Sequence, residues 1–226
     1  MIKAVIFDLD GTLLNRDESL KLFINLQYDR LINQLGHMPK EKYVSRFIEL
    51  DRRGYVWKDK VYTQLADEFN IIALSPEDLL SDYIAEFKNC CVPFSGLFKM
   101  LSELKSENLF LGMITNGYGQ FQMDNIETLN IKKYFDTILI SEWEGTKKPD
   151  AIIFNRALER LGVTAHESIY IGDHPENDVK AAQSVGMKAI WKRDSQWNHV
   201  DADGIIDELS EIPFILGELG TVDKRW

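Results

Sequence analysis

The feature that most constrains the fold of this chain is a set of short, continuously apolar runs that end in polar residues. The clearest run covers residues 3–9, and similar runs cover 109–114 and 168–171, with weaker ones at 137–140 and 188–191. Strands with both faces buried have this pattern, because helices cover both sides of a parallel sheet. The runs therefore predict the strands of a parallel sheet.

Helical spacing separates these runs. The predicted helices span residues 97–107, 120–129, 151–161 and 177–185. Gly162 and Gly186 follow two of them, at positions where a left-handed residue commonly ends a helix. Strands that alternate with helices predict an α/β fold with a Rossmann-like, doubly wound parallel sheet.

Residues 19–87 have a different pattern, with repeated helical spacing and few strand-like runs. Breaks occur at residues 36–39 and before Ser75, a plausible N-cap that Pro76 follows at the first helical position. We therefore expect an inserted bundle of four helices. The predicted domains are a core of residues 1–16 and 90–226 and a helical insert of residues 17–89.

The composition disfavours several classes of protein. The 226 residues are 45% hydrophobic and 27% charged, as in soluble globular proteins, which argues against disorder and fibrous repeats. With 26 basic and 36 acidic residues the net charge is −10, whereas sequence-independent binding to nucleic acid or an anionic membrane needs a basic surface. We therefore expect neither nucleic acid nor a membrane as a partner.

Cysteine usage and hydropathy indicate the compartment. Cys90 and Cys91 are the two cysteines, and their adjacent positions fit reduced thiols rather than a disulfide framework. No apolar run in the sequence approaches the roughly 20 residues of a membrane-spanning helix. We expect a cytoplasmic protein, and a monomer and a homodimer are equally compatible with the sequence.

Polar residues follow the predicted strands, and in open α/β sheets a ligand site lies beyond the carboxyl ends of the strands. Four carboxylates that meet there would repel one another unless protonated or bridged by a cation. Oxygen ligands without cysteine or histidine favour Mg²⁺, which commonly takes a further ligand from a substrate phosphate. The pattern predicts a site that moves a phosphoryl group. The converging residues are Asp8, Asp10, Thr115, Asn116, Lys147, Lys148, Asp173 and Asp178.

The segment Ile6–Leu13, with the sequence IFDLDGTL, resembles the first motif of the haloacid dehalogenase (HAD) superfamily, DxDGT. The resemblance continues through Thr115, Lys148-Pro149 and the Gly172–Asp178 motif in the family's order, and so covers essentially the whole chain. The first motif is specific, whereas the threonine and lysine motifs would be weak alone. The helical insert is similar to the cap domain of phosphoglycolate phosphatases, nucleotidases and sugar-phosphate phosphatases.

The resemblance implies that the first motif carries the chemistry. Asp8 would attack phosphorus to form an aspartyl-phosphate, and its carboxylate would also bind Mg²⁺. Asp10 would protonate the leaving alcohol and then activate the hydrolytic water, while its backbone carbonyl binds the metal. Asp173 is the expected direct metal ligand. Asp178 would lie near the metal through water or hold Lys148; alternatively, it is only an acid at a helix N-terminus.

The resemblance also implies a set of phosphate-binding residues. Thr115 would donate its hydroxyl hydrogen to a phosphate oxygen, with help from the backbone N–H of Asn116. Lys148, which directly precedes proline as in the family, would neutralise charge on the transferring group. Gly11 would permit a positive φ or a close approach to the phosphate. The implied substrate-binding residues are Gly11, Thr12, Thr115, Asn116 and Lys148.

The leading hypothesis is a Mg²⁺-dependent phosphatase that hydrolyses a small phosphomonoester, namely a nucleotide, a sugar phosphate or phosphoglycolate. A sugar-phosphate mutase shares every motif and is the alternative. A 2-haloacid dehalogenase is disfavoured because members with that activity lack the second acid, here Asp10. A non-catalytic scaffold is also disfavoured, because binding alone does not need so many close charges. The Thr115–Tyr118 string and the Asp173-to-Asp178 spacing resemble nucleotidase-like members.

Overall fold

The computed structural model of the chain describes residues 1–220 and shows two compact units. The core unit contains Met1–Asn15 and the chain from Pro93 onward. The helical unit contains Arg16–Val92. Within residues 1–220, no helix is both long enough and apolar enough to span a membrane.

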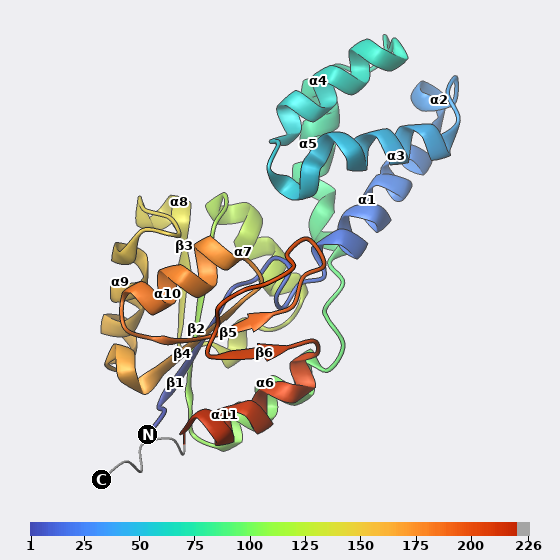
Figure 1. The fold of residues 1–226 in the computed structure, drawn as a ribbon. Helices are drawn as coiled ribbons and strands as arrows, with labels where there is room; N and C mark the ends of the chain where they lie inside the picture. The colour runs from blue at the N-terminus through green and yellow to red at the C-terminus, as the bar shows by residue number, and fades with distance from the viewer. Residues whose placement is uncertain (221–226) are drawn as a thin grey trace. The chain divides into compact units, whose positions relative to one another are not determined.

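The core unit is built around a six-stranded sheet in which all neighbouring strands are parallel (Figure 1). The strand order is β3-β2-β1-β4-β5-β6. The chain therefore places β2 and β3 on one side of β1 and then β4, β5 and β6 on the other side. This arrangement confirms the predicted α/β fold with a doubly wound sheet. The strands are β1 (Ala4–Phe7), β2 (Phe110–Thr115), β3 (Thr137–Ile140), β4 (Ser168–Gly172), β5 (Lys188–Lys192) and β6 (Gly204–Ile206).

Helices cover both faces of this sheet (Figure 1). The helices α9 and α10 contribute to the apolar cluster on one face, while α6 and α11 lie together on the other. The α-helices of the core unit are α6 (Leu97–Ser106), α7 (Gly119–Thr128), α8 (Ser141–Glu144), α9 (Ala151–Leu161), α10 (Ala181–Ser184) and α11 (Ile212–Gly220). All five predicted strands are present.

Two features of the core unit differ from the sequence-based prediction. The three-residue strand β6 was not predicted, because so short a segment has no recognisable periodicity. The helix predicted at 177–185 begins earlier, as a π-helical turn over Pro175–Lys180, and continues into α10. The early start arises from His174, whose ring nitrogen Nδ1 accepts hydrogen bonds from the backbone N–H groups of Glu176 and Asn177 and so caps the turn.

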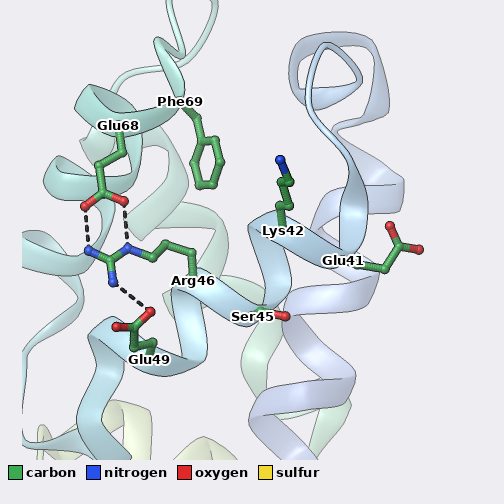
Figure 2. A pocket seen from close by; sticks show the side chains of 7 residues that line it. All are labelled: Glu41, Lys42, Ser45, Arg46, Glu49, Glu68 and Phe69. Atoms are coloured by element: carbon green, nitrogen blue, oxygen red, sulfur yellow. Dashed lines mark hydrogen bonds and ion pairs between the residues drawn. The ribbon is translucent and has the colours of Figure 1, made fainter.

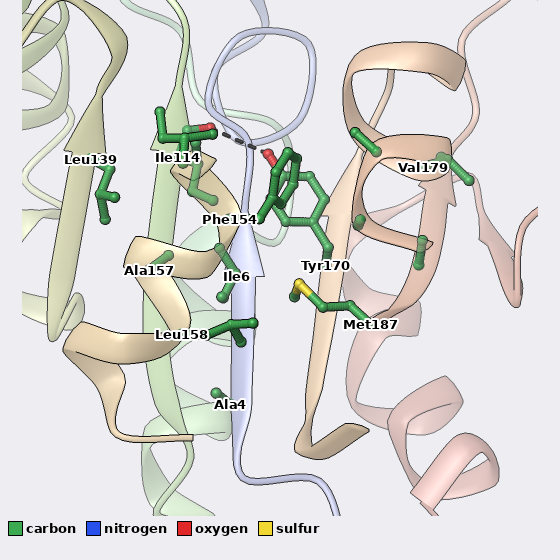
Figure 3. Packing of buried hydrophobic residues seen from close by; sticks show 14 of the residues in the cluster. Ala4, Ile6, Ile114, Leu139, Phe154, Ala157, Leu158, Tyr170, Val179 and Met187 are labelled. Atoms are coloured by element: carbon green, nitrogen blue, oxygen red, sulfur yellow. Dashed lines mark hydrogen bonds between the residues drawn. The ribbon is translucent and has the colours of Figure 1, made fainter. Parts of the chain in front are cut away.

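The central strand β1 is buried on both faces. All four of its residues have no exposed surface, and successive side chains point to opposite faces of the sheet. Ala4 and Ile6 pack in a cluster that includes Phe154 of α9 and Tyr170 of β4 (Figure 3). The Phe154 and Tyr170 rings meet edge to face, with centroids 5.1 Å apart. The cluster anchors the strand whose end carries the first acidic motif.

The helical unit contains four long α-helices and one short one. Its helices are α1 (Arg16–Arg30), α2 (Ile32–Leu35), α3 (Lys40–Asp51), α4 (Lys58–Phe69) and α5 (Pro76–Glu86). Ser75 caps α5 as predicted: its hydroxyl oxygen accepts from the backbone N–H of Asp78, and the Asp78 carboxylate accepts from the backbone N–H of Ser75. Inside the bundle, the buried amide oxygen of Gln27 accepts hydrogen bonds from the hydroxyls of Tyr43 and Tyr62. The bundle therefore has a partly polar interior in which these groups are paired.

A pocket of about 430 Å³ lies on the helical unit, lined by residues of α3 and the end of α4 (Figure 2). The guanidinium of Arg46 makes two hydrogen bonds to Glu68, at 2.6 and 2.7 Å, and an ion pair to Glu49 at 2.7 Å. The charge of this arginine is thus already balanced. None of the predicted site residues lines the pocket.

Phe154 offers a test of the packing around β1. Replacing this fully buried ring by alanine should lower the free energy of unfolding by about 3–5 kcal/mol, because it leaves a cavity beside Tyr170. Phe214, which is 72% exposed, supplies the control, and Phe214→Ala should change the value by less than about 0.5 kcal/mol. Urea unfolding measures both. Equal effects of the two substitutions would contradict the packing described here.

Candidate active site

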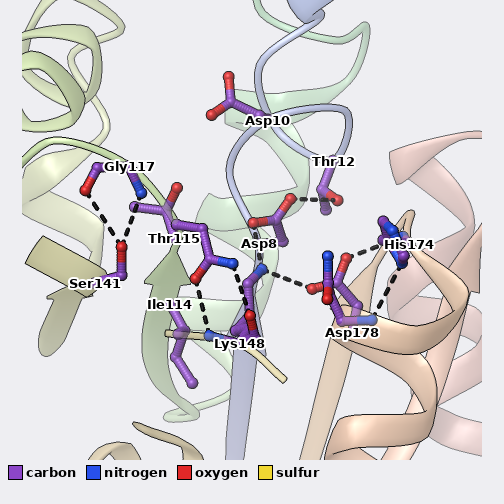
Figure 4. A network of polar contacts seen from close by, with 12 residues as sticks. Asp8, Asp10, Thr12, Ile114, Thr115, Gly117, Ser141, Lys148, His174 and Asp178 are labelled. Atoms are coloured by element: carbon purple, nitrogen blue, oxygen red, sulfur yellow. Dashed lines mark hydrogen bonds and ion pairs between the residues drawn. The ribbon is translucent and has the colours of Figure 1, made fainter. Parts of the chain in front are cut away.

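The register of the sheet brings the predicted motifs to one edge. Phe7 of β1 pairs with Met113 of β2 and with Ile171 of β4, so the residues that follow these three strands become neighbours. The backbone N–H of Asp8 continues the ladder by donating to the carbonyl of Ile171 at 2.9 Å. Figure 4 shows Asp8, Thr115, Lys148 and Asp178 gathered at this edge.

A buried lysine lies at the centre of the site. The Nζ atom of Lys148 lies 2.6 Å from Asp8 Oδ1, 2.6 Å from Asp178 Oδ1 and 3.0 Å from the hydroxyl oxygen of Tyr170. All four side chains are almost completely buried. Burial alone would lower the pKa of Lys148, but the carboxylates of Asp178 and Asp8 raise it well above its usual value. Lys148 is therefore a permanent cation between two acids.

The acids outnumber this cation. Asp8, Asp173 and Asp178 each offer a carboxylate oxygen, and these oxygens lie within 4.8 Å of one another. Burial raises the pKa of Asp8 to about 7, against the opposing effect of Lys148. Burial, together with the charges of Asp8 and Asp178, raises the pKa of Asp173 well above its usual value. One ammonium and three carboxylates leave a deficit of positive charge, and hard oxygen donors fit a divalent cation such as Mg²⁺.

Glycine is required at two positions around these acids. A Cβ atom on Gly11 would lie 2.3 Å from Asp173 Oδ2, and its φ of +84° is one that other residues rarely adopt. A Cβ atom on Gly172 would lie 2.4 Å from the Cβ and Cγ atoms of Asp178. Both glycines let the backbone approach a carboxylate more closely than any side chain would allow.

Asp10 lies apart from the three clustered carboxylates (Figure 4). Its Oδ2 atom accepts a hydrogen bond of 2.6 Å from the side-chain amide of Gln122 on α7. The same amide nitrogen lies 2.8 Å from the hydroxyl oxygen of Thr115, which is buried at the end of β2. The fully buried Thr12 makes a long contact of 3.4 Å from its Oγ1 to Asp8 Oδ2. The first and second motifs are thus connected through a side chain.

The side chain of Asn116 connects to the lysine motif. Its Nδ2 donates to the backbone carbonyl of Lys148 at 3.0 Å, and its Oδ1 accepts from the backbone N–H of Lys148 at 2.9 Å. Next along the loop, the backbone N–H of Gly117 donates to Ser141 Oγ at 2.9 Å. The two bonds of the Asn116 side chain fix the Thr115 loop against the segment that carries Lys148. They involve the side chain, whereas the predicted phosphate contact of Asn116 involves its backbone N–H.

The carboxylate of Asp178 holds Lys148, which is one of the three arrangements considered for it. Its Oδ1 atom accepts from Lys148, and its Oδ2 atom accepts from the backbone N–H of His174 at 3.0 Å. Asp178 therefore contacts the lysine directly, in addition to its position in the first turn of a helical segment. The His174 ring itself is engaged with the backbone of the turn that follows it, through the N–H groups of Glu176 and Asn177.

Sequence patterns did not identify Tyr170 or Gln122. Tyr170 lies within an apolar strand, where an aromatic residue usually indicates only packing. The one sequence signal for a polar contact was the presence of a hydroxyl in a run predicted to be buried. Gln122 has no comparable signal, because Gln120 lies two residues away on the same helix and the two glutamines cannot be told apart without the fold.

Comparison with known proteins identifies the family of the chain. The model of the haloacid dehalogenase-like hydrolase family matches residues 5–192. The chain belongs to this family. A glyceraldehyde 3-phosphate phosphatase of Pyrococcus furiosus is 30% identical to it, over 99% of this chain and 97% of the relative. A pyrimidine 5′-nucleotidase of Escherichia coli is 30% identical over 56% of this chain and 55% of the relative.

A solved structure of a HAD phosphatase from Thermococcus onnurineus is 29% identical, with a TM-score of 0.68 and coverage of 96% of this chain and 98% of that one. The predicted family and the predicted class of enzyme, a HAD-family hydrolase with phosphatase relatives, are confirmed by these comparisons. The acidic cluster is compatible with metal binding. The individual roles of the site residues remain predictions.

The raised pKa of Asp8 predicts a pH dependence of stability. Because this pKa is about 7 in the folded protein and about 3.8 ordinarily, the folded protein binds more protons than the unfolded chain between these pH values. The contribution of Asp8 to stability therefore falls as the pH rises through this range. Relative to Asp8→Asn, the wild type should lose up to about 1.4 kcal/mol for each pH unit between about pH 4 and 7.

Urea unfolding of both proteins in EDTA measures this difference. Asp201→Asn, at an exposed position of the core unit, is the matched control and should follow the wild type at every pH. A wild-type stability that runs parallel to that of Asp8→Asn across the range would contradict the prediction.

Proposed function

We propose that the chain is a Mg²⁺-dependent phosphatase that hydrolyses a small phosphomonoester through an aspartyl-phosphate on Asp8. The observation that supports this most directly is the buried ion cluster in which Lys148 joins Asp8 to Asp178, with Asp173 beside them. Burying these charges costs desolvation free energy, and a site that only stabilised the fold could use apolar side chains instead. It is suited to hold a nucleophile and a dianionic group in one place.

In the proposed first step, a carboxylate oxygen of Asp8 attacks phosphorus and the bond from phosphorus to the ester oxygen breaks. Asp10 gives its proton to the departing alkoxide, which leaves as the alcohol. In the second step Asp10 takes a proton from a water molecule, whose oxygen attacks the phosphorus. The acyl phosphate bond then breaks, which releases inorganic phosphate and restores the Asp8 carboxylate.

The other residues of the site stabilise charge in this scheme. Lys148 neutralises negative charge shared by Asp8 and the transferring group, from a position fixed by Asp178 and Tyr170. Thr115 and the backbone N–H of Asn116 bind phosphate oxygens, with Gly11 and Thr12 shaping the loop around them. The carboxylates of Asp8, Asp173 and Asp178 and the backbone carbonyl of Asp10 would hold Mg²⁺. When bound, the ion supplies positive charge to the phosphoryl oxygens.

The substrate class is proposed from the relatives. Likeness to a glyceraldehyde 3-phosphate phosphatase extends over nearly the whole chain, whereas likeness to the pyrimidine nucleotidase covers about half of it. This favours small sugar phosphates over the nucleotides that the motif strings favoured. Residues 17–89 are the proposed cap domain, which selects the substrate. A cytoplasmic location and a monomeric or homodimeric state stay predictions.

Phosphate release tests the proposed reaction. Wild-type protein with Mg²⁺ should release phosphate from at least one member of a panel of sugar, nucleotide and glycolate phosphates. Asp8→Asn should lower kcat by about a thousandfold or more, since the nucleophile is lost, and EDTA should abolish release by the wild type. Asp201→Asn, an exposed change of the same chemistry, should match the wild type. Release that persists in Asp8→Asn would contradict the proposal.

Thermal unfolding tests the metal site separately from activity. Mg²⁺ at about 100 times its Kd should stabilise the wild type by about 2.7 kcal/mol, because the folded protein alone holds the ligands together. Asp173→Asn removes one of the three clustered carboxylates, so the same Mg²⁺ concentration should raise its Tm much less. An equal rise in Tm in both proteins would contradict the proposal that Asp173 binds the metal.

A further inference from the structure

Gln122 is a buried side chain to which the proposed mechanism assigns no role. It lies on α7 with 3% of its surface exposed, and its amide nitrogen Nε2 faces three oxygens of the site. The distances are 2.6 Å to Asp10 Oδ2, 2.8 Å to Thr115 Oγ1 and 3.2 Å to the carbonyl of Asn116. An amide nitrogen has two hydrogens, so the two shorter contacts account for both.

The surroundings fix this amide in its orientation. The fully buried Asn125, one turn later on α7, donates from Nδ2 to Gln122 Oε1 at 3.2 Å, which directs the nitrogen of Gln122 toward Asp10 and Thr115. On the other side, a Cβ atom on Gly117 would lie 2.8 Å from Gln122 Cγ. The glycine after Asn116 thus leaves the space that the glutamine side chain occupies.

The two contacts have different consequences for the two acceptors. Within residues 1–220, Gln122 makes the one side-chain hydrogen bond to the Asp10 carboxylate, which is otherwise partly exposed. The Thr115 hydroxyl oxygen accepts from Gln122, and among residues 1–220 the hydroxyl donates to no other group. That hydrogen is therefore directed to whatever acceptor enters the site, and a phosphoryl oxygen is such an acceptor.

We propose that Gln122 is a positioning residue that holds the Asp10 carboxylate for proton transfer and prepares Thr115 as a donor to phosphate. The assignment rests on the proposed function, because it gives Gln122 a role through Asp10 and Thr115 rather than through the reacting atoms. The side chain of Gln122 contacts Asp10, which lies 112 positions away in the sequence.

Gln122→Met tests the assignment, because methionine has a similar volume and no amide hydrogen. With an alkyl phosphate that the wild type hydrolyses, kcat should fall about 10- to 100-fold, less than the full value of general acid–base catalysis, while KM changes much less. Gln120→Met is the matched control. Gln120 is exposed on the same helix and bonds to Asp124, so this variant should keep the wild-type kcat and KM.

The leaving group provides a readout that general damage would not reproduce. p-Nitrophenolate departs without a proton, so Asp10 is not needed in the first step with p-nitrophenyl phosphate. Gln122→Met should therefore form the aspartyl-phosphate from this substrate with a much smaller loss of rate than it shows with the alkyl phosphate, a loss that reflects the Thr115 contact alone. Hydrolysis of that intermediate still needs Asp10 as a base. Rapid mixing should therefore show a burst of about one nitrophenolate per active site, followed by slow turnover.

Gln122→Leu serves as a second variant, because leucine also lacks the amide hydrogens and adds no charge beside Asp10. Both variants should retain a Tm near that of the wild type; if Gln122→Met unfolds, the burst of Gln122→Leu decides. Wild-type kinetics in a folded variant, or equal losses in burst and turnover, would overturn the assignment alone. A wild type that releases no phosphate from any substrate would overturn the proposed function together with it.

Discussion

The rest of the site depends on two buried ion pairs, which the ammonium of Lys148 makes with Asp8 and with Asp178. Three acids with close carboxylates could not stay ionised at this depth without a cation, because burial and mutual repulsion both favour the protonated form. One lysine balances one of the three charges. The remaining negative charge attracts a divalent cation. A protein that only bound a partner would not need so many buried charges close together.

The sheet makes this cluster possible by supplying rigid, parallel strand ends. Asp8 and Asp173 follow adjacent strands in register, and Lys148 reaches Asp8 from the segment between α8 and α9. The strands are held by apolar contacts on both faces, of which the Phe154 and Tyr170 pair is one. Tyr170 belongs to both systems, because its ring packs in the core and its hydroxyl contacts Lys148. The packing of the core and the position of Lys148 are therefore coupled through this residue.

Predictions from sequence were accurate where the signal is local. The run Ala4–Phe7 is apolar at every position because β1 is covered on both faces, and the acidic motif follows it directly. Ser75 and Pro76 were identified as the start of a helix by residue type alone. The strand β6 and the π-helical turn at Pro175 were missed, because the first depends on pairing with β5 and the second on capping by His174.

The sequence by itself determined the family, the order of the motifs and the residue types at the strand ends, since these are properties of short segments. It also determined which side chains could act as acids and donors. The tertiary structure decided which of them touch: Lys148 meets an acid 140 positions away, and Gln122 meets one 112 positions away. Such contacts depend on strand order, register and the space left by glycines, so no short segment of sequence encodes them.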